Sequence, residues 1–491
     1  MVEIDELREL IGGHQEWLLI RTRGRTFPLD GREIEIDSDG KSAHFGFLDD
    51  KGFHTWRINS FKCDGGEIAI DVAGAFAKNR ETMRLVPRTA AAELSAEIML
   101  ARLVRANEIA SLVAEHFHGS RIARVALNEE NGRFAQISFE TIERRPTAAF
   151  ADVTAKLTVE LILAAAILWL EKLSTRKNKP VTDLLVVCER RQARNAQKLH
   201  ALLNESWREK LTIAEIDRKG ETPRLVVLPK RKIRDLWREK APKLKIPAAN
   251  EVTKAARDII DRASIETDIV HSRQGETLRY LGLPFARLRT MLGKEKAWFG
   301  VGRVRRPLET ENRNDLAEMV TELETYRSHD SPNTRHQHYR AASEAWLESI
   351  LRRDIRALDS NLILSPIYHQ FRSLNDKIDL LALRRDRRLV IIEVKTQPDR
   401  ASIFQAIDYW RKIELQRRRG ILAAADLFEG REILDKPALI YIAAPAWSFH
   451  RDFEFFARAT APEIELWRFE LHENWREKIK VVARQNYTGL T

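Results

Sequence analysis

Two carboxylates and a lysine near the end of the chain have the types and spacing that metal-dependent phosphate chemistry requires. Asp379 is followed fourteen residues later by Glu393, and Lys395 comes two residues after Glu393. On a strand, residues two apart point to one face, so Glu393 and Lys395 are expected to lie side by side. Carboxylate oxygens suit Mg²⁺, which polarises a phosphodiester and generates a hydroxide nucleophile. A nearby ammonium can orient that water and offset developing negative charge.

A structural alternative is a surface pair between Glu393 and Lys395, with Asp379 capping a turn. The neighbouring sequence argues against it. Residues 380–383 and 389–392 are apolar and are separated by a charged run at 384–388, which predicts a hairpin that brings Glu393 back beside Asp379. An apolar run on both faces indicates a central strand covered on both sides. Charges at the mouth of such a strand are costly unless they pair, bind a metal or meet a charged ligand.

The elements on either side of this hairpin are expected to complete the site. Residues 343–351 have apolar side chains at helical spacing, with Glu344 and Glu348 four apart on one face. Residues 402–410 begin a second predicted helix, which contains Gln405, and residues 436–443 read as the following strand.

This pattern resembles the PD-(D/E)XK nuclease superfamily, whose core runs helix, three strands, helix, strand. The resemblance covers roughly residues 340–484 and is closest to E-x-K endonucleases that act on mismatched, branched or foreign DNA. Ile378 stands where the motif name has Pro, a departure that removes no ligand.

The resemblance implies a role for each residue. Asp379, Glu393 and Glu344 would hold Mg²⁺, for which Mn²⁺ can substitute, and Glu348 is the alternative to Glu344. Lys395 would position and activate water, and Gln405 would orient either the backbone near the scissile phosphate or water. The implied partner is DNA. An RNA substrate, and a nucleic-acid-binding or sensor protein that no longer cuts, stay open as alternatives.

Composition fits a nucleic-acid partner and an intracellular protein. The chain has 491 residues, with 83 Lys+Arg against 72 Asp+Glu, a net charge of +11 and a pI near 9.5. This length predicts two to four domains. Cys63 and Cys188 are far apart and are expected to be unpaired thiols in a reducing cytoplasm. The apolar stretch 161–170 is too short to span a bilayer and predicts a buried helix.

Residues 1–88 are predicted to form a small antiparallel β domain, as a meander or small barrel. Short strand-like stretches alternate with turn signals such as Asp39-Gly40. The aromatic residues of this region fit a core better than a base-stacking surface, and a role in binding DNA or a protein partner stays open. The expected strands are 16–22, 33–36, 42–47, 53–59, 67–72 and 83–86.

Residues 89–229 are predicted to form an α/β domain that echoes the nuclease unit. A shift of 255 positions aligns the apolar strands of the two regions, and a generic α/β domain in fortuitous register is the alternative. At that shift Arg124, Ser138 and Glu140 would replace the three site residues, so this copy would be degenerate. The aligned segments are 131–141 with 386–396, 184–188 with 439–443, and 226–227 with 481–482.

Residues 230–340 are predicted to be a basic, mainly helical linker region, before the nuclease domain at 341–491. The run 230–245 either grips phosphates or forms a solvated helix. His336 and His338 form a His-x-His pair, but no third ligand is evident in the sequence, which favours a polar loop.

The function predicted from sequence is a Mg²⁺-dependent DNA endonuclease or exonuclease, in DNA repair or defence against foreign DNA. The chain has one intact residue set, so either a monomer nicks one strand or two chains pair as a two-fold dimer, which we favour. We expect no membrane partner.

Overall fold

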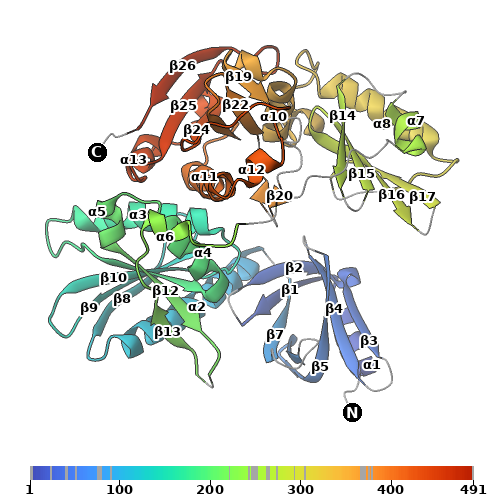
Figure 1. Cartoon of the computed structure of the whole chain (residues 1–491). Coiled ribbons are helices and arrows are strands. Elements are labelled where there is room, and N and C mark those ends of the chain that lie inside the picture. The colour runs from blue at the N-terminus through green and yellow to red at the C-terminus, as the bar shows by residue number, and fades with distance from the viewer. Residues whose placement is uncertain are drawn as a thin grey trace. The chain divides into compact units, whose positions relative to one another are not determined.

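The computed structural model divides the chain into two compact units (Figure 1). Unit 1 comprises residues 1–200 and 206–230, and unit 2 comprises 201–205 and 231–491. Ile378 and Asp379 lie outside the described residues. The structure describes residues 4–22, 25–38, 42–49, 52–73, 80–88, 91–220, 222–241, 244, 253–260, 266–272, 275–291, 294–302, 306–364, 372–373, 376–377 and 380–488.

Unit 1 begins with a seven-stranded antiparallel sheet in the order β2-β1-β7-β6-β5-β4-β3. Its core contains fully buried Trp17, Phe45 and Phe47, so the prediction of an all-β N-terminal region with core aromatics is confirmed. The first helix and β2 were not predicted. The elements are α1 (Ile4–Gly12), β1 (Glu16–Arg21), β2 (Thr26–Asp30), β3 (Ile34–Ser38), β4 (Ala43–Asp49), β5 (Gly52–Asp64), β6 (Glu67–Ala73) and β7 (Arg80–Pro87).

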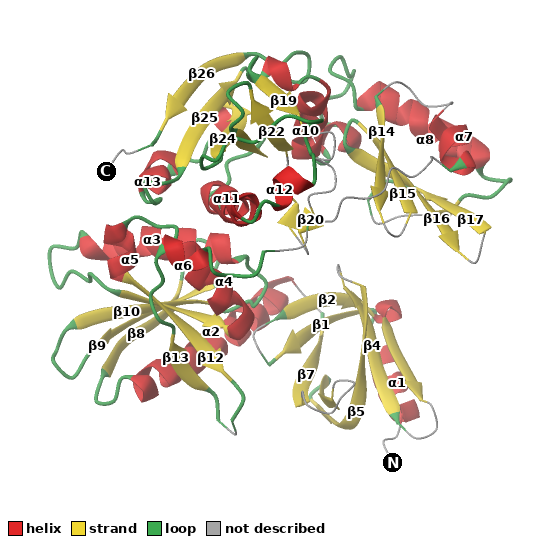
Figure 2. Ribbon diagram, viewed as in Figure 1, coloured by secondary structure: helices red, strands yellow, loops and turns green. Residues whose placement is uncertain are grey.

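A six-stranded mixed sheet follows in unit 1, in the order β13-β12-β11-β10-β9-β8. Figure 2 distinguishes its strands from the helices of the same unit by colour. The apolar stretch predicted as a buried helix is α3, whose N-cap Thr158 accepts a hydrogen bond from Leu161 N. The elements are α2 (Ala91–His116), β8 (Arg121–Leu127), β9 (Phe134–Glu140), β10 (Pro146–Asp152), α3 (Val159–Ser174), β11 (Leu184–Glu189), α4 (Arg190–His200), α5 (Glu205–Lys210), β12 (Leu211–Asp217) and β13 (Arg224–Val227).

A buried histidine at the end of α4 makes unit 1 sensitive to acid. His200 is 1% exposed, and its Nε2 lies 3.1 Å from both Arg208 O and Leu211 O. Burial lowers the pKa of His200 to about 4. The unfolded chain takes up this proton near its ordinary pKa of about 6.5, so stability falls as the pH drops from about 6.5 towards 4.

We expect this histidine to cost the fold about 2 kcal/mol of unfolding free energy at a pH of about 5. In urea unfolding followed at pH 7 and pH 5, His200→Gln will therefore lose less stability on acidification than the unmodified chain. His118→Gln, at an exposed position of the same unit, is the matched control and should behave as the unmodified chain. Equal acid sensitivity in all three proteins would contradict the assignment.

Unit 2 begins with short helices and a five-stranded antiparallel sheet in the order β14-β15-β16-β17-β18. The prediction of a mainly helical region is therefore wrong for residues 267–307. It is not a linker either, because Leu278 and Phe285 share one hydrophobic core with the C-terminal sheet. The elements are α6 (Ile233–Leu236), α7 (Lys254–Ile260), β14 (Thr267–Ser272), β15 (Gly275–Tyr280), β16 (Leu283–Met291), β17 (Lys294–Phe299), β18 (Arg306–Pro307), α8 (Arg313–Tyr326) and α9 (Gln337–Arg340).

The C-terminal part of unit 2 is a six-stranded mixed sheet in the order β19-β22-β23-β24-β25-β26, beside a small β20–β21 pair. Its central strand β23 is buried along its whole length, as the apolar run predicted. The elements are α10 (Ser343–Arg353), β19 (Leu362–Leu364), β20 (Arg372–Ser373), β21 (Asp376–Lys377), β22 (Leu380–Arg384), β23 (Leu389–Val394), α11 (Ser402–Arg418), α12 (Ile421–Ala424), β24 (Leu439–Pro445), α13 (Phe453–Arg458), β25 (Glu465–Leu471) and β26 (Val481–Asn486).

The two six-stranded sheets have the same topology. In each sheet the first three strands pair antiparallel with one another. The third, fourth and fifth strands are parallel, and the sixth pairs antiparallel with the fifth. Each sheet follows a helix, α2 or α10, and has a second helix, α3 or α11, before its fourth large strand. Segments 121–141 and 183–188 thus share one sheet, as the duplication hypothesis required.

The alignment by 255 positions does not hold across the two sheets. Counted along the strand pairings from Val187 and Ile442, it fails for the edge strands, where Val227 corresponds to Gln485 and not to Val482. It also fails for the earlier strands. Val187 of β11 and Ile442 of β24 are related by that shift, and their partners on the preceding strand are Ala151 and Glu393. Ala151 lies on β10, whereas the shift had matched Glu393 to a residue of β9. Ser138 and Glu140 are therefore not the counterparts of Glu393 and Lys395. Ala151 and Val153 occupy those two positions, so the first sheet lacks this charged pair. The match of Arg124 to Asp379 stays a prediction, because Asp379 lies outside the described residues.

Two further expectations concern membrane-spanning helices and cysteine pairing. No helix of the described ranges is both long and apolar enough to cross a membrane. Cys63 is exposed and Cys188 buried, and both are free, as predicted. Burial raises the pKa of the Cys188 thiol to about 12, so this group stays protonated at neutral pH.

Candidate active site

The backbone of β23 fixes the positions of Glu393 and Lys395. Glu393 is paired with Ile442 of the parallel strand β24, and Lys395 N donates a 3.0 Å hydrogen bond to Ala443 O just beyond the strand end. Val394, between them, belongs to the hydrophobic core that also contains α10. Because side chains alternate along a strand, Glu393 and Lys395 point to the opposite face, against which α11 packs.

The Lys395 ammonium lies among three carboxylates. Its Nζ is 2.9 Å from Glu393 Oε1, 3.3 Å from Asp399 Oδ2 and 3.9 Å from Glu344 Oε2. The exposed fraction of the side chain rises from 3% for Glu393 to 31% for Asp399 and 48% for Glu344. The cluster is therefore closed at Glu393 and open to solvent at Glu344.

The electrostatics of the cluster favour a cation in addition to Lys395. Burial alone would lower the pKa of Lys395, but Glu393, Glu344 and Asp399 together raise it above its ordinary value, so the ammonium stays charged. Three carboxylates thus lie within 4 Å of one ammonium. Carboxylate oxygens are the ligands that a divalent ion such as Mg²⁺ prefers.

The structure separates the two acidic candidates on α10. Glu344 is exposed in the first turn and reaches Lys395, whereas Glu348, one turn later, is 4% exposed. Ser343, immediately before Glu344, is also tied to the strand side, because its Oγ lies 2.6 Å from Thr396 Oγ1. Glu344 is therefore the acid of α10 whose contact with Lys395 the structure shows.

The start of α10 is held in place by a buried arginine. Arg327 is fully buried and donates hydrogen bonds to Ala341 O at 2.6 Å and Ala342 O at 3.2 Å. The same guanidinium donates to Leu281 O at 2.8 Å, in the turn between β15 and β16. These bonds offset the cost of burying the charge and fix the helix that carries Glu344.

A glycine allows that turn to approach α10 closely. Gly282 has φ +80°, and a Cβ at this position would lie 2.1 Å from Ala345 O. Only glycine fits both the left-handed backbone and the close contact. The five-stranded sheet thus supports the helix that presents Glu344.

Asp399 is the site residue that sequence reasoning missed. Its Oδ1 accepts a 2.8 Å hydrogen bond from Ala401 N at the beginning of α11, while its other oxygen faces Lys395. The available signal was an aspartate just before a predicted helix, which is a common capping residue. One carboxylate therefore both orders the start of α11 and adds charge to the cluster.

Gln405 lies in the first turn of α11, as predicted, with its backbone N bonded to Ala401 O at 2.9 Å. Its Oε1 is buried and has no hydrogen-bond partner in the described part of the chain. Among the described residues, no hydrogen bond or ion pair joins the Gln405 side chain to the Lys395 cluster, so the role of Gln405 stays a prediction. Asp379 lies outside the described residues, and its chain neighbour Leu380 pairs with Ile392 of β23.

Another group suited to a metal lies in unit 2, where Glu322 of α8 is close to His336 and His338. The sequence had favoured a polar loop at the two histidines because the third ligand is distant along the chain. The group does not by itself identify the metal.

Comparison with known proteins adds little to this geometry. No protein-family model matches the chain, and no curated protein is significantly similar to it in sequence. A solved apo structure of EndoMS matches with a TM-score of 0.13 and 11% identity, over 37% of this chain and 84% of that one. At this TM-score the match supports no inference about this protein.

Proposed function

We propose that unit 2 is a Mg²⁺-dependent nuclease that hydrolyses DNA phosphodiester bonds at the Lys395 cluster. The observation that carries the proposal is the position of Lys395 within 4 Å of three carboxylates at the end of a fully buried central strand. Burying charges in such a cluster costs stability, and a functional role would explain why the chain carries it.

The residues would divide the chemistry among them. Glu393, Asp379 and Glu344 would hold the metal ion, and the excess of carboxylates over cations in the described cluster fits that role. Mg²⁺, when bound, supplies polarisation of the phosphodiester and a more acidic water. Lys395 would hold the attacking water and offset charge on the phosphate, because its ammonium stays protonated. Gln405 would donate a hydrogen bond from its side-chain amide to the phosphate backbone of the substrate.

Two properties of the chain support a nucleic-acid substrate. The net charge of +11 favours binding to a polyanion. The main elements of the C-terminal sheet also follow the core order of the PD-(D/E)XK superfamily, which the sequence resembles. They are helix α10, strands β19, β22 and β23, helix α11 and strand β24. We infer that the protein acts on DNA in the reducing cytoplasm, where its two free cysteines stay reduced.

The first sheet has no such cluster in its described part, because Ala151 and Val153 occupy the corresponding positions. We therefore expect each chain to cut one strand per encounter, with double-strand breaks made by a two-fold dimer. A protein partner that binds the N-terminal sheet would not change this expectation for the dimer.

A digestion panel tests the proposal. The purified chain is incubated with single-stranded, duplex, mismatched and branched DNA, and with RNA, in Mg²⁺, Mn²⁺ or EDTA. We expect cleavage of at least one DNA substrate with either metal and none in EDTA. Cleavage of supercoiled plasmid then separates nicking from double-strand cleavage. The mass of the protein in solution shows whether the cutting species is a monomer or a dimer. Binding of DNA without cleavage under all conditions would instead identify a non-cutting protein, and exclusive cleavage of RNA would reassign the substrate.

A further inference from the structure

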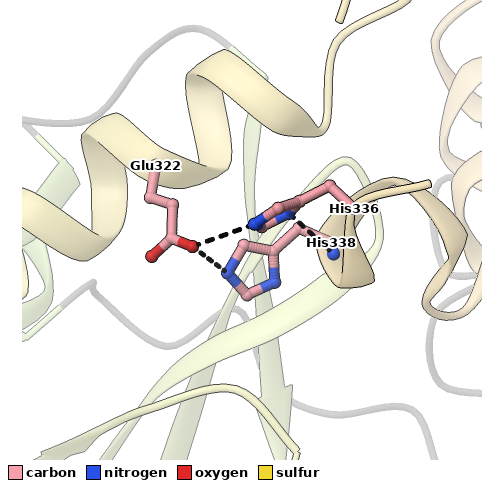
Figure 3. Close-up of side chains that lie close together, drawn as sticks. All are labelled: Glu322, His336 and His338. Carbon is pink, nitrogen blue, oxygen red and sulfur yellow. Dashed lines mark hydrogen bonds and ion pairs between the residues drawn. The ribbon is translucent and has the colours of Figure 1, made fainter. Parts of the chain in front are cut away.

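The segment before α10 contains a cluster of metal-ligating side chains that the nuclease proposal does not use. Glu322 is on α8, and His336 and His338 come from the turn that begins α9 (Figure 3). Glu322 Oε1 lies 3.3 Å from His336 Nε2 and 3.5 Å from His338 Nε2. One ligand atom from each of the three residues lies within 4.8 Å of the others.

We propose that Glu322, His336 and His338 bind a divalent transition-metal ion of the zinc class, which fastens α8 to the segment that leads into α10.

The donor set and its dimensions select this class of ion. Two imidazole nitrogens and one carboxylate suit zinc and its neighbours, whereas Mg²⁺ takes oxygen ligands almost alone. Ligand atoms about 2.05 Å from a tetrahedral ion are separated by about 3.3 Å. The two measured separations from Glu322 Oε1 are close to this value. Three protein ligands leave a fourth position for water.

The two rings are already held in place. His336 stacks on Tyr326 with ring centroids 3.9 Å apart and an interplanar angle of 16°. The backbone of His338 is fixed by its carbonyl, which accepts a 2.8 Å hydrogen bond from the buried Arg327. A metal would therefore find its ligands ordered and would lose little of its binding energy in arranging them.

The two histidines differ in their burial and in their hydrogen bonds. His338 is 4% exposed, and a metal binds the neutral form of its imidazole ring. Its Nδ1 has no hydrogen-bond partner among the residues described, so the ring can carry its proton there while Nε2 binds the ion. His336 Nδ1 accepts a 3.2 Å hydrogen bond from His338 N, a bond that metal binding at Nε2 would give up. We therefore expect His338 to be the stronger ligand.

The position of the cluster assigns a structural role to the ion. His338 lies five residues before Ser343, where α10 begins, and Arg327 bonds both His338 O and the carbonyls at the start of α10. A metal at His338 would thus stabilise the same segment from its other side. This role is separate from the Lys395 cluster and does not depend on nuclease activity.

Zinc binding to the full chain tests the proposal directly. After EDTA treatment and removal of the chelator, equilibrium dialysis with Zn²⁺ should load one ion per chain, and Co²⁺ should give the intense visible bands of a tetrahedral site. Glu322→Gln and His338→Gln should each weaken Zn²⁺ binding at least tenfold. Because the Glu322 side chain is 42% exposed, its replacement leaves the fold intact.

Matched variants distinguish this site from others. Glu318→Gln lies at an exposed position of the same helix and His329→Gln at an exposed position of the same loop, and both should bind Zn²⁺ as the unmodified chain does. Glu393→Gln should also retain the ion, which separates the result from that of the nuclease proposal. Absence of Zn²⁺ binding, or equal affinity in Glu322→Gln and His338→Gln, overturns the inference and leaves a hydrogen-bonded cluster.

Discussion

Glu393→Gln will reduce Mg²⁺-dependent DNA cleavage by about three orders of magnitude while the chain remains folded. The substitution keeps the shape of the side chain and removes one negative charge from a position that is 2% exposed. A metal contributes several kcal/mol of charge stabilisation to such a reaction, and each factor of ten in rate corresponds to about 1.4 kcal/mol. Lys395 keeps Asp399 and Glu344 as partners, so the cation is not left isolated.

Single-turnover cleavage and DNA affinity should be measured together, because the prediction concerns rate and not binding. Glu470→Gln is the matched control: Glu470 lies on β25 of the same sheet, and its carboxylate is paired with Arg468 at 2.8 Å. This control should cut as the unmodified chain does. Asp379→Asn should behave like Glu393→Gln. Cleavage at the unmodified rate by the double variant of Asp379 and Glu393 would remove the proposed site.

Lys395→Met will also abolish cleavage, but it will preserve or strengthen metal binding. The ammonium acts on water and phosphate and is not a ligand, so its loss leaves all carboxylates in place and increases the excess of negative charge. In the absence of metal this variant should be less stable by about 3–5 kcal/mol, because the buried Glu393 carboxylate loses its nearest partner. Added Mn²⁺ should restore much of that stability.

Calorimetric Mn²⁺ titration and unfolding with and without Mn²⁺ check both parts of this prediction. Lys412→Met is a suitable control, since Lys412 of α11 is similarly enclosed, with 13% of its side chain exposed, and lies 2.7 Å from Asp408. The double variant of Glu393→Gln with Lys395→Met should recover stability without recovering activity. Loss of Mn²⁺ affinity in Lys395→Met alone would show that the lysine organises the ligands instead of acting on water.

The local sequence pattern predicted β23 and its charged residues Glu393 and Lys395, but not all of the residues that contact them. The apolar run before Glu393 and the spacing to Lys395 are properties of a single strand, and the structure has that strand buried as expected. Asp399 was missed because its proximity to Lys395 depends on where α11 begins and how it packs on the sheet. Glu322 was missed for the same reason, since its distance from His336 along the chain conceals their contact in space.

Errors in the fold follow from identifiable residues. Pro28 argued against a strand at 26–30, yet β2 is at the edge of its sheet, where a residue without an N–H is tolerated. The many charges of residues 267–299 obscured strands that bury only alternate side chains, as the pattern of β15 shows. In the alignment of the two sheets, apolar strands match one another easily, and only the pairing of β10 with β11 reveals the correct register.

The equal topology of the two sheets places an apolar pair in one where the other has a charged pair. Ala151 and Val153, at the positions of Glu393 and Lys395, are 1% and 0% exposed. A carboxylate or an ammonium introduced singly at either position would be buried without a partner, at a cost of several kcal/mol, which is a large fraction of the stability of a domain. Any stepwise exchange between the two pairs passes through such a singly charged protein, in either direction. We therefore expect the first sheet to retain its apolar pair while its exposed loops accept substitutions.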